Sequence, residues 1–414
     1  MRSSSVIGLV ALVGLVGCVG DEARDDGEPS DDGDGDEYTP FDSKADGNSA
    51  LGGPIEFASK CAPGARTTIG AVGDVLLHGA LQQQAMERPT RGRFASLWSP
   101  VTDLLSAADT QYANLEGPTA HGVNASGRDV TDPGFRWDNV VYSSYPQFNY
   151  HGFLEEDLKA SGIDVVSTAN NHAMDRRQLG ADRTIERLRE VGLAFTGTHH
   201  RNALDAPWHT TTDARGFKLA WLACSFSTNG LPDPSGQVLG CWEDEAIVVD
   251  QIKKLRATAG IDAVIITPHW GEEYTASPSR AQRDLAKRFL DAGATMILGS
   301  HPHVLQPWEK HVTPDGRETF VIYSLGNFVS GQAQLARRST ILLYVGLTRT
   351  SAGVKINGVR YVPMIMNTRD GVRAVEAIDR AGGNADSRKQ TVTMFGTMNL
   401  QDPAQPIATT PACY

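Results

Sequence analysis

The strongest constraint on the fold is the alternation of short apolar runs with amphipathic segments between residues 67 and 298. Runs of strand length occupy 67–72, 110–115, 163–167, 194–196, 218–223, 263–267 and 294–298. Apolar residues at helical spacing lie between them, at 94–107, 151–160, 179–191, 247–257 and 279–291. Such alternation is typical of a parallel or mixed sheet covered by helices. The sequence therefore predicts a layered α/β domain.

Two regions of the chain depart from this alternation. Residues 119–148 are polar and aromatic without a clear period, which predicts a long functional loop. From residue 318 onward the pattern is mostly strand, at 320–323, 340–347 and 354–366. The strand-rich part, 318–414, indicates a second sheet or an antiparallel edge.

The N-terminal residues have the features of an export signal. Arg2 precedes an apolar run at 6–16, which fits a signal-peptide core of about 7–15 residues. The run is too short for a membrane-spanning helix, which needs about 20 residues. Leu15-Val16-Gly17-Cys18 resembles the bacterial lipobox, which predicts cleavage after residue 17 and lipidation of Cys18. An ordinary signal peptide is the alternative.

The acidic charge is concentrated just after this signal. Residues 21–46 contain twelve Asp and Glu against Arg24 and Lys44, whereas the whole chain has a net charge of −11. We interpret residues 18–60 as a disordered tether, since such a composition buries too little apolar surface to fold. The remaining domain, 61–414, is nearly neutral. It has no basic excess of the kind that nucleic-acid binding requires.

An exported chain favours disulfides. Once Cys18 is lipidated, four cysteines remain, namely Cys61, Cys224, Cys241 and Cys413. They allow three connectivities, of which we favour Cys224–Cys241 with Cys61–Cys413. Free buried thiols are the alternative. No Cys-x-x-Cys motif is present, which argues against a thiolate metal site.

Residues able to bind a metal follow the predicted strands repeatedly. They are Asp74, Glu116, Asn171, His172, His269, His301 and His303. Parallel strands bring such ends to one edge of a sheet. Carboxylates, an amide and imidazoles together suit Mn, Fe or Zn better than calcium. Because the candidates outnumber the ligands of one tetrahedral site, we predict two divalent ions about 3.5–4 Å apart.

The order of these motifs resembles the capsule-synthesis CapA family, which is associated with poly-γ-glutamate production and is similar to calcineurin-like metallophosphoesterases. The motifs that carry the resemblance are Gly73-Asp74, Asn114-Leu115-Glu116, Asn170-Asn171-His172-Ala173-Met174-Asp175, His269-Trp270-Gly271, Ser300-His301-Pro302-His303 and Ser324-Leu325-Gly326-Asn327-Phe328. The resemblance covers about residues 65–330. It implies a four-layer αββα sandwich of metallophosphoesterase type with mixed sheets.

The resemblance also implies roles for individual residues. Asp74 and His303 would hold the first metal, Glu116 would bridge, and the second metal would be held by Asn171, His269 and His301. His172 would be a general acid or would contact the substrate oxyanion. Asp175 could orient His172 or cap the next helical turn.

The chain departs from the phosphoesterase pattern at two positions. Leu76 stands where those enzymes carry a histidine, and His78, two residues further on, could substitute for it or be a simple loop histidine. Glu116 stands where they carry Asp. These differences argue against ordinary phosphatase activity.

The resulting functional hypothesis is a metal-dependent CapA-like hydrolase, lipid-anchored in the bacterial cell envelope and extracytoplasmic. Its substrate would be a phosphoester or an anionic peptide polymer, and its partners would be the membrane and capsule-polymer synthase subunits. We expect no nucleic-acid partner. The alternatives are a non-catalytic accessory subunit of a capsule-polymer assembly complex and a metal-dependent peptide epimerase.

Overall fold

The computed structural model describes residues 37–41, 51–88 and 92–409. The predicted signal peptide, Cys18 and most of the acidic segment lie outside the described residues. Among those described, no helix has the length and apolar character needed to cross a membrane.

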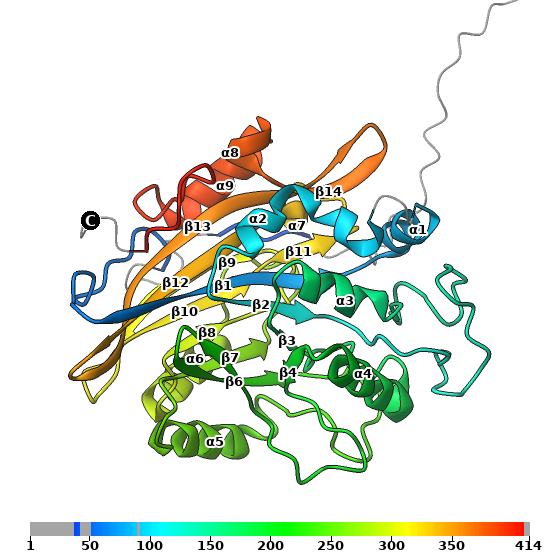
Figure 1. Ribbon diagram of the computed structural model, residues 1–414, viewed down its shortest axis with the longest axis horizontal. Helices are drawn as coiled ribbons and strands as arrows, with labels where there is room; N and C mark the ends of the chain where they lie inside the picture. Colours follow the sequence, from blue (N-terminus) through cyan, green and yellow to red (C-terminus); the bar gives the residue numbers. More distant parts are fainter. Residues whose placement is uncertain (1–36, 42–50, 89–91, 410–414) are drawn as a thin grey trace, which may run out of the picture.

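Two β-sheets form the centre of the molecule (Figure 1). In the first, the strand order is β14-β13-β12-β1-β2-β3-β4, and β11 also pairs with β1. Its strands are β1 (Ala65–Leu76), β2 (Thr110–Leu115), β3 (Val165–Ser167), β4 (Ala194–Thr196), β11 (Asn327–Ser330), β12 (Ser339–Thr350), β13 (Gly353–Arg369) and β14 (Val372–Ala377). Strands β1 to β4 and β11 are parallel, whereas β12, β13 and β14 pair antiparallel, so this sheet is mixed.

The second sheet has the order β5-β6-β7-β8-β10-β9. Its strands are β5 (Thr210–Ala214), β6 (Phe217–Ser225), β7 (Ala263–His269), β8 (Met296–Leu298), β9 (Leu305–Val312) and β10 (Glu318–Leu325). The four inner strands are parallel and the two edge strands antiparallel.

Most helices cover the outer faces of the two sheets (Figure 1), whereas the last described helix contributes Met394 and Phe395 to the core between the sheets. Their bounds are α1 (Gly79–Glu87), η2 (Arg93–Leu97), η3 (Ser99–Val101), α2 (Thr102–Leu105), α3 (Phe153–Ala160), α4 (Arg177–Val191), α5 (Glu245–Ala257), α6 (Arg280–Ala292), α7 (Leu335–Arg338), α8 (Ile378–Ala381) and α9 (Ala385–Phe395). The elements from α1 to α4 pack on the first sheet, and α5 and α6 pack on the second. Helix α6 begins with a capping box between Ser279 and Gln282, which satisfies backbone N–H groups at its first turn.

Alternate residues of each strand face opposite layers, as the pleat of a strand requires. In β6, Trp221 faces the inner core between the sheets, whereas Leu222 faces the core beneath the helices. The Trp221 ring stacks on Tyr112 of the first sheet, with ring centroids 5.6 Å apart. The sheets therefore pack face to face, and the four-layer αββα sandwich with mixed sheets is confirmed.

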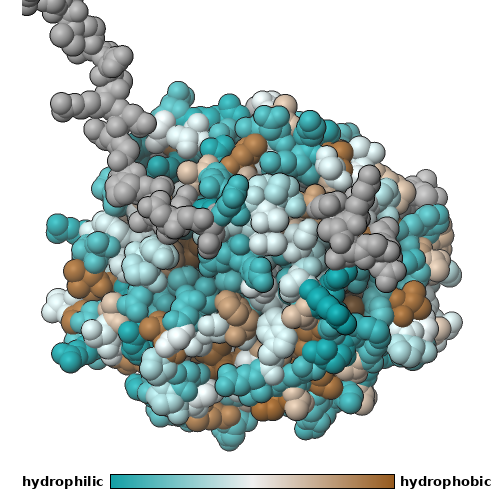
Figure 2. All heavy atoms as spheres, turned by 180° about the vertical axis from the view of Figure 1, so that it is seen from behind, coloured by the Kyte–Doolittle hydropathy of each residue, from teal (hydrophilic) through white to brown (hydrophobic). Residues whose placement is uncertain are grey.

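The surface seen from behind shows apolar residues in small separate groups among hydrophilic ones (Figure 2). This pattern is ordinary for a folded domain whose large apolar side chains are internal.

Several boundaries differ from the sequence prediction. The helix predicted over 94–107 is three short helices, because Pro100 lies at the start of η3 and interrupts the backbone hydrogen bonds. The strands β5, β9, β11 and β14 and the helices α1, α7, α8 and α9 were not predicted. Residues 119–148 contain no helix or strand, as expected.

The tether was predicted to reach residue 60, and this boundary is wrong. Phe57 is only 1% exposed and packs in the core between the sheets, as does Ile55. Further upstream, the Thr39 N–H donates to the Tyr274 carbonyl at 3.1 Å. The burial of Ile55 and Phe57 thus joins the segment around them to the domain, although its composition resembles that of a linker.

A disulfide joins Cys224 and Cys241, the pairing favoured from the sequence. Cys61 is also disulfide-bonded, and its predicted partner Cys413 lies outside the described residues. The first bridge closes a loop of sequence separation 17 and lies beside β6.

We expect the double substitution Cys224→Ala/Cys241→Ala to lower the free energy of unfolding by about 3 kcal/mol. Without the cross-link, the unfolded chain gains conformational entropy, and for a loop of this length the gain is worth about that much. Chemical denaturation under non-reducing conditions measures the change. A loss below about 0.5 kcal/mol would contradict the prediction.

Candidate metal centre

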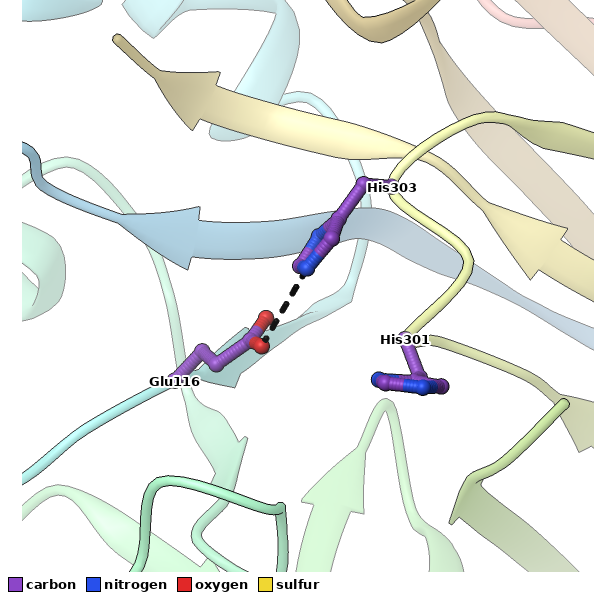
Figure 3. Close-up of side chains that lie close together, drawn as sticks. All are labelled: Glu116, His301 and His303. Carbon is purple, nitrogen blue, oxygen red and sulfur yellow. Dashed lines mark ion pairs between the residues drawn. The ribbon is translucent and has the colours of Figure 1, made fainter. Parts of the chain in front are cut away.

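The predicted ligands come from neighbouring strands of both sheets. Asp74 lies in β1 and Glu116 directly follows β2, while Asn171 follows β3. In the second sheet, His269 ends β7, and His301 and His303 follow β8. Figure 3 shows Glu116 from one sheet pointing toward His301 and His303 from the other. The two sheet edges therefore meet at one cluster of side chains.

Asp74 does not end its strand, contrary to the sequence prediction. Strand β1 continues to Leu76, and its pairing register with β2 and β11 shifts at Asp74. A bulge of this kind re-aims a side chain within a strand. Asp74 is thus directed to the site by a local irregularity rather than by a loop.

The distances within the cluster are short. His303 Nδ1 lies 3.3 Å from Asp74 Oδ2, and His303 Nε2 lies 3.8 Å from Glu116 Oε1. His269 Nε2 lies 3.6 Å from Glu116 Oε1 and 2.9 Å from Asn171 Oδ1. The His269 and His301 ring centroids are 4.7 Å apart.

Two overlapping sets of ligand atoms lie within 4.8 Å of one another. One contains Glu116, His301 and His303, and the other contains Asp74, Glu116 and His269. Glu116 belongs to both sets, as a bridging carboxylate would. The sets place His301 with His303 and Asp74 with His269, which differs from the division of ligands that the resemblance implies.

Three buried polar atoms of the cluster have no hydrogen-bond partner among the described residues, namely Asp74 Oδ2, Glu116 Oε1 and His301 Nδ1. Burying such atoms without a partner costs free energy. Oxygen and imidazole nitrogen atoms are suitable donors for a first-row divalent cation. The residues present therefore fit a metal centre.

The electrostatics of the cluster agree with this fit for His269 and His301, whereas His303 would have to release a proton to bind a metal. Burial, together with the negative charge of Asp74, raises the pKa of Glu116 well above its usual value. Burial and the nearby imidazoles lower the pKa of His269 and His301, so both rings are neutral at pH 7. For His303, burial lowers the pKa, but Glu116 and Asp74 outweigh it and raise the pKa to about 10. Neutral imidazole is the form that binds metals.

The backbone around the two histidines has unusual geometry. His301 has φ 99° and His303 has φ 58°, a region that residues other than glycine rarely occupy. Gly299 precedes them, and a Cβ atom there would lie 2.0 Å from the Tyr323 carbonyl oxygen. Backbone strain of this kind costs about 1–3 kcal/mol per residue and is concentrated at functional sites.

Comparison with known proteins agrees with the arrangement of these motifs. The model of the bacterial capsule synthesis protein family PGA_cap matches residues 68–332, which include every predicted ligand. The chain belongs to this family.

Two CapA proteins are similar to this PGA_cap chain. The capsule biosynthesis protein CapA of Bacillus anthracis is 31% identical over 200 residues, and the match covers 46% of each chain. The PGA biosynthesis protein CapA of Bacillus subtilis strain 168 is 28% identical over 294 residues, 68% of each chain. The match thus spans about half the length of the first relative and two thirds of the second.

Two solved structures are also similar. A novel phosphatase from Mycoplasma pneumoniae has a TM-score of 0.39 at 12% identity, covering 80% of this chain and 99% of that one. The calcineurin-like phosphoesterase YfkN of Bacillus subtilis has a TM-score of 0.41 at 14% identity, covering 80% and 96%.

Two asparagines support the candidate ligands of the PGA_cap chain. Asn114 Nδ2 donates to Asp74 Oδ1 at 2.8 Å and lies 3.3 Å from His269 Nδ1. His303 Nδ1 and Asn327 Oδ1 are 3.0 Å apart, and Asn327 Nδ2 donates to the His303 carbonyl. A fully buried amide inside the otherwise apolar end of β2 was the available signal for Asn114.

His172 and Asp175 form a buried pair beside the ligands. His172 Nδ1 lies 2.8 Å from Asp175 Oδ2, which also accepts the Phe148 N–H at 2.6 Å. Arg176, not Asp175, stands at the N-cap of α4, and no side chain caps this helix. Of the two roles considered for Asp175, the structure favours orienting His172.

Leu76 and His78, and several other residues near the cluster, lie outside the two ligand sets. Leu76 is a buried core residue. His78 is buried, and its Nδ1 accepts the Gly331 N–H at 3.2 Å, so this nitrogen is engaged by the backbone. Trp270 and Trp308 are fully buried core residues. Glu273 is close enough to raise the pKa of Glu116 and His303, whereas Glu272 is exposed.

Proposed function

We propose that this PGA_cap chain is a metal-dependent hydrolase of capsule synthesis that acts on a phosphoester or an anionic peptide polymer. The observation that carries the proposal is the convergence of buried carboxylate, amide and imidazole atoms from both sheets, with Glu116 common to both ligand sets. Family membership agrees with a role in the cell envelope.

The residues present suit two divalent ions such as Mn, Fe or Zn. Asp74 and His303 would hold one, Asn171, His269 and His301 the other, and Glu116 would bridge them. Such a pair supplies an activated water and neutralises charge on the substrate oxygens. Asn114 and Asn327 hold Asp74 and His303 in place, and tight orientation of ligands by such partners raises metal affinity.

His172 is the residue we assign to proton transfer. Its Nδ1 bonds to Asp175, which leaves Nε2 free to serve the substrate. From this position His172 can donate a proton to the leaving oxygen or nitrogen, or can hydrogen-bond the developing oxyanion.

We also propose a substrate class and partners for this chain. The relatives' names concern capsule and PGA biosynthesis, and for this chain we propose a poly-γ-glutamate-like polymer or a phosphoester. Lipidation of Cys18 would anchor the protein extracytoplasmically to a membrane, near capsule-polymer synthase subunits.

Metal content is the first test. Purified protein reconstituted with Mn²⁺, Fe²⁺ or Zn²⁺ and then desalted should retain two ions per chain by elemental analysis, and His301→Ala/His303→Ala should retain fewer. Hydrolysis of bis(4-nitrophenyl) phosphate and of γ-glutamyl oligomers should depend on the metal and stop with chelator. A metal-free wild-type protein contradicts the proposal. Bound metal without hydrolysis favours the accessory-subunit alternative, and deuterium uptake into a peptide favours the epimerase.

Metal binding should also stabilise the fold. At a free metal concentration 100 times the Kd, we expect each bound ion to add about 2.7 kcal/mol to the free energy of unfolding, or about 5.4 kcal/mol for two independent sites. Thermal denaturation with and without metal measures the effect, and the His301→Ala/His303→Ala variant serves as the control. An equal shift in both proteins would place the bound metal elsewhere.

A further inference from the structure

Arg176 is a fully buried arginine next to the His172–Asp175 pair. Burial lowers its pKa to about 10, so the guanidinium remains charged at neutral pH. Removing such a charge from water costs several kcal/mol unless its N–H groups are all bonded. The hydrogen bonds of Arg176 therefore indicate what this residue does.

Those hydrogen bonds join three separate parts of the loop 119–148. Nε donates to the Val123 carbonyl at 3.1 Å, and Nη2 donates to the Val141 carbonyl at 3.1 Å and to Ser143 Oγ. Nη1 donates to the carbonyls of Gln147 and Asp175, both at 3.2 Å. This loop contains no helix or strand, so the hydrogen bonds of Arg176 are an important link between its separate parts.

The sequence makes room for this side chain at Gly180, inside α4. A Cβ atom at Gly180 would lie 2.1 Å from Arg176 Cβ. Glycine inside a helix costs roughly 0.5–1 kcal/mol relative to alanine. Glycine is nevertheless needed at position 180, because a larger residue would collide with Arg176.

The end of the same loop contacts the proton-transfer pair. Phe148 follows Gln147, and its N–H donates to Asp175 Oδ2, the oxygen that also bonds His172 Nδ1. The Phe148 ring packs edge-on against the His172 ring, with centroids 4.8 Å apart. The loop therefore sets both the partner and the packing of His172.

We infer that Arg176 is a positioning residue for the hydrolase. Its hydrogen bonds hold the separate parts of the loop 119–148 together and so keep Phe148 in contact with Asp175 and His172. This contact fixes the orientation of the His172 ring for proton transfer. This inference rests on the proposed function. It assigns to Arg176 an effect on turnover that passes through His172 rather than through metal binding.

The test is a double-substitution cycle on the full, metal-loaded protein. Arg176→Lys keeps the charge but cannot bond to all five acceptors. It should lower kcat about 10- to 100-fold in the presence of His172, with KM and metal content changed less than 2-fold. In a His172→Ala background the same substitution should change kcat less than 3-fold.

A matched control is available on the same helix. Arg183 of α4 also bonds this loop, at the His121 carbonyl and at Asp129 Oδ1, but away from Phe148. Arg183→Lys should leave kcat within 2-fold of wild type. If Arg176→Lys fails to fold, Ser143→Ala removes a single acceptor and should lower kcat about 2- to 5-fold.

Amide hydrogen exchange supplies a readout that needs no turnover. In Arg176→Lys the Phe148 amide should exchange at least 10-fold faster than in wild type, and in Arg183→Lys it should not. Unchanged exchange overturns the inference, as does an equal loss of kcat in both His172 backgrounds, which would make Arg176 a purely structural clamp. If the wild type binds metal but hydrolyses none of the substrates, both the proposed function and the catalytic role inferred here are overturned. The exchange rate of the Phe148 amide would still show whether Arg176 holds the loop.

Discussion

Glu116→Gln is expected to lower kcat steeply and to reduce bound metal from two ions to at most one per chain. Glu116 is the only residue common to both ligand sets found among the described residues. Glutamine has the same shape, but it lacks the negative charge and presents an N–H₂ group that repels a cation. Loss of several kcal/mol of charge stabilisation corresponds to a fall in kcat on the order of 10³-fold. Elemental analysis and steady-state kinetics measure the two effects.

The metal-free form of this variant should remain folded. Burial and Asp74 both disfavour a charged Glu116, so a neutral amide is accommodated without metal. Its thermal midpoint in chelator should therefore not fall below that of the metal-free wild type.

Glu155→Gln is the matched control for Glu116→Gln. Glu155 is another fully buried glutamate, bonded to Thr119 and paired with Arg187, and it belongs to neither ligand set. Its substitution should leave two ions bound and kcat nearly unchanged. If Glu155→Gln lost metal as readily as Glu116→Gln, the bridging role of Glu116 would have to be abandoned.

His172→Ala is expected to lower kcat about 10²- to 10⁴-fold while metal content stays at two ions, because proton transfer typically contributes that factor. Asp175→Asn should give a smaller loss, since it removes the charge that orients His172 but keeps the ring. The measurement is kcat at saturating substrate, with elemental analysis on the same preparations.

The leaving group separates the two roles considered for His172. Loss of a general acid lowers kcat little when the leaving group is a weakly basic nitrophenolate, and lowers it greatly when the leaving group is an alkoxide or an amine. If His172 instead contacts the oxyanion, its substitution should lower kcat equally for both substrates.

His311→Asn is the control for His172→Ala. It breaks a similar His–Asp pair between His311 Nε2 and Asp291 Oδ1 at 2.8 Å, and it should leave kcat unchanged. Loss of metal from His172→Ala would show that His172 is a ligand rather than an acid.

Much of the fold could be predicted because the strands of the core are continuous apolar runs. The runs at 110–115 and 194–196 match β2 and β4 in both bounds. Parallel strands buried on both faces produce such runs, and glycine or polar residues at their ends mark the turns. Prediction failed for β9, whose outer half alternates between half-buried and exposed residues, and for Phe57, whose burial depends on contacts far away in the chain.

The candidate ligands could be predicted for the same reason, since each lies near the end of an apolar strand. Two supporting contacts could not. Asn114 donates to Asp74, 40 positions earlier in the chain, and Asp175 accepts the N–H of Phe148, 27 positions before it. Contacts of this range leave no periodic pattern in the chain.

The sequence by itself determined which candidate metal-binding side chains are present, their order and, except for Asp74, their place at the ends of parallel strands. These properties are local, because they follow from residue type and the spacing of apolar positions. Only the tertiary structure decided that the edges of the two sheets meet, that Glu116 lies between His269 and His303, and that Arg176 gathers the loop beside His172. Those outcomes depend on how separate layers pack, and packing is a property of the whole folded chain.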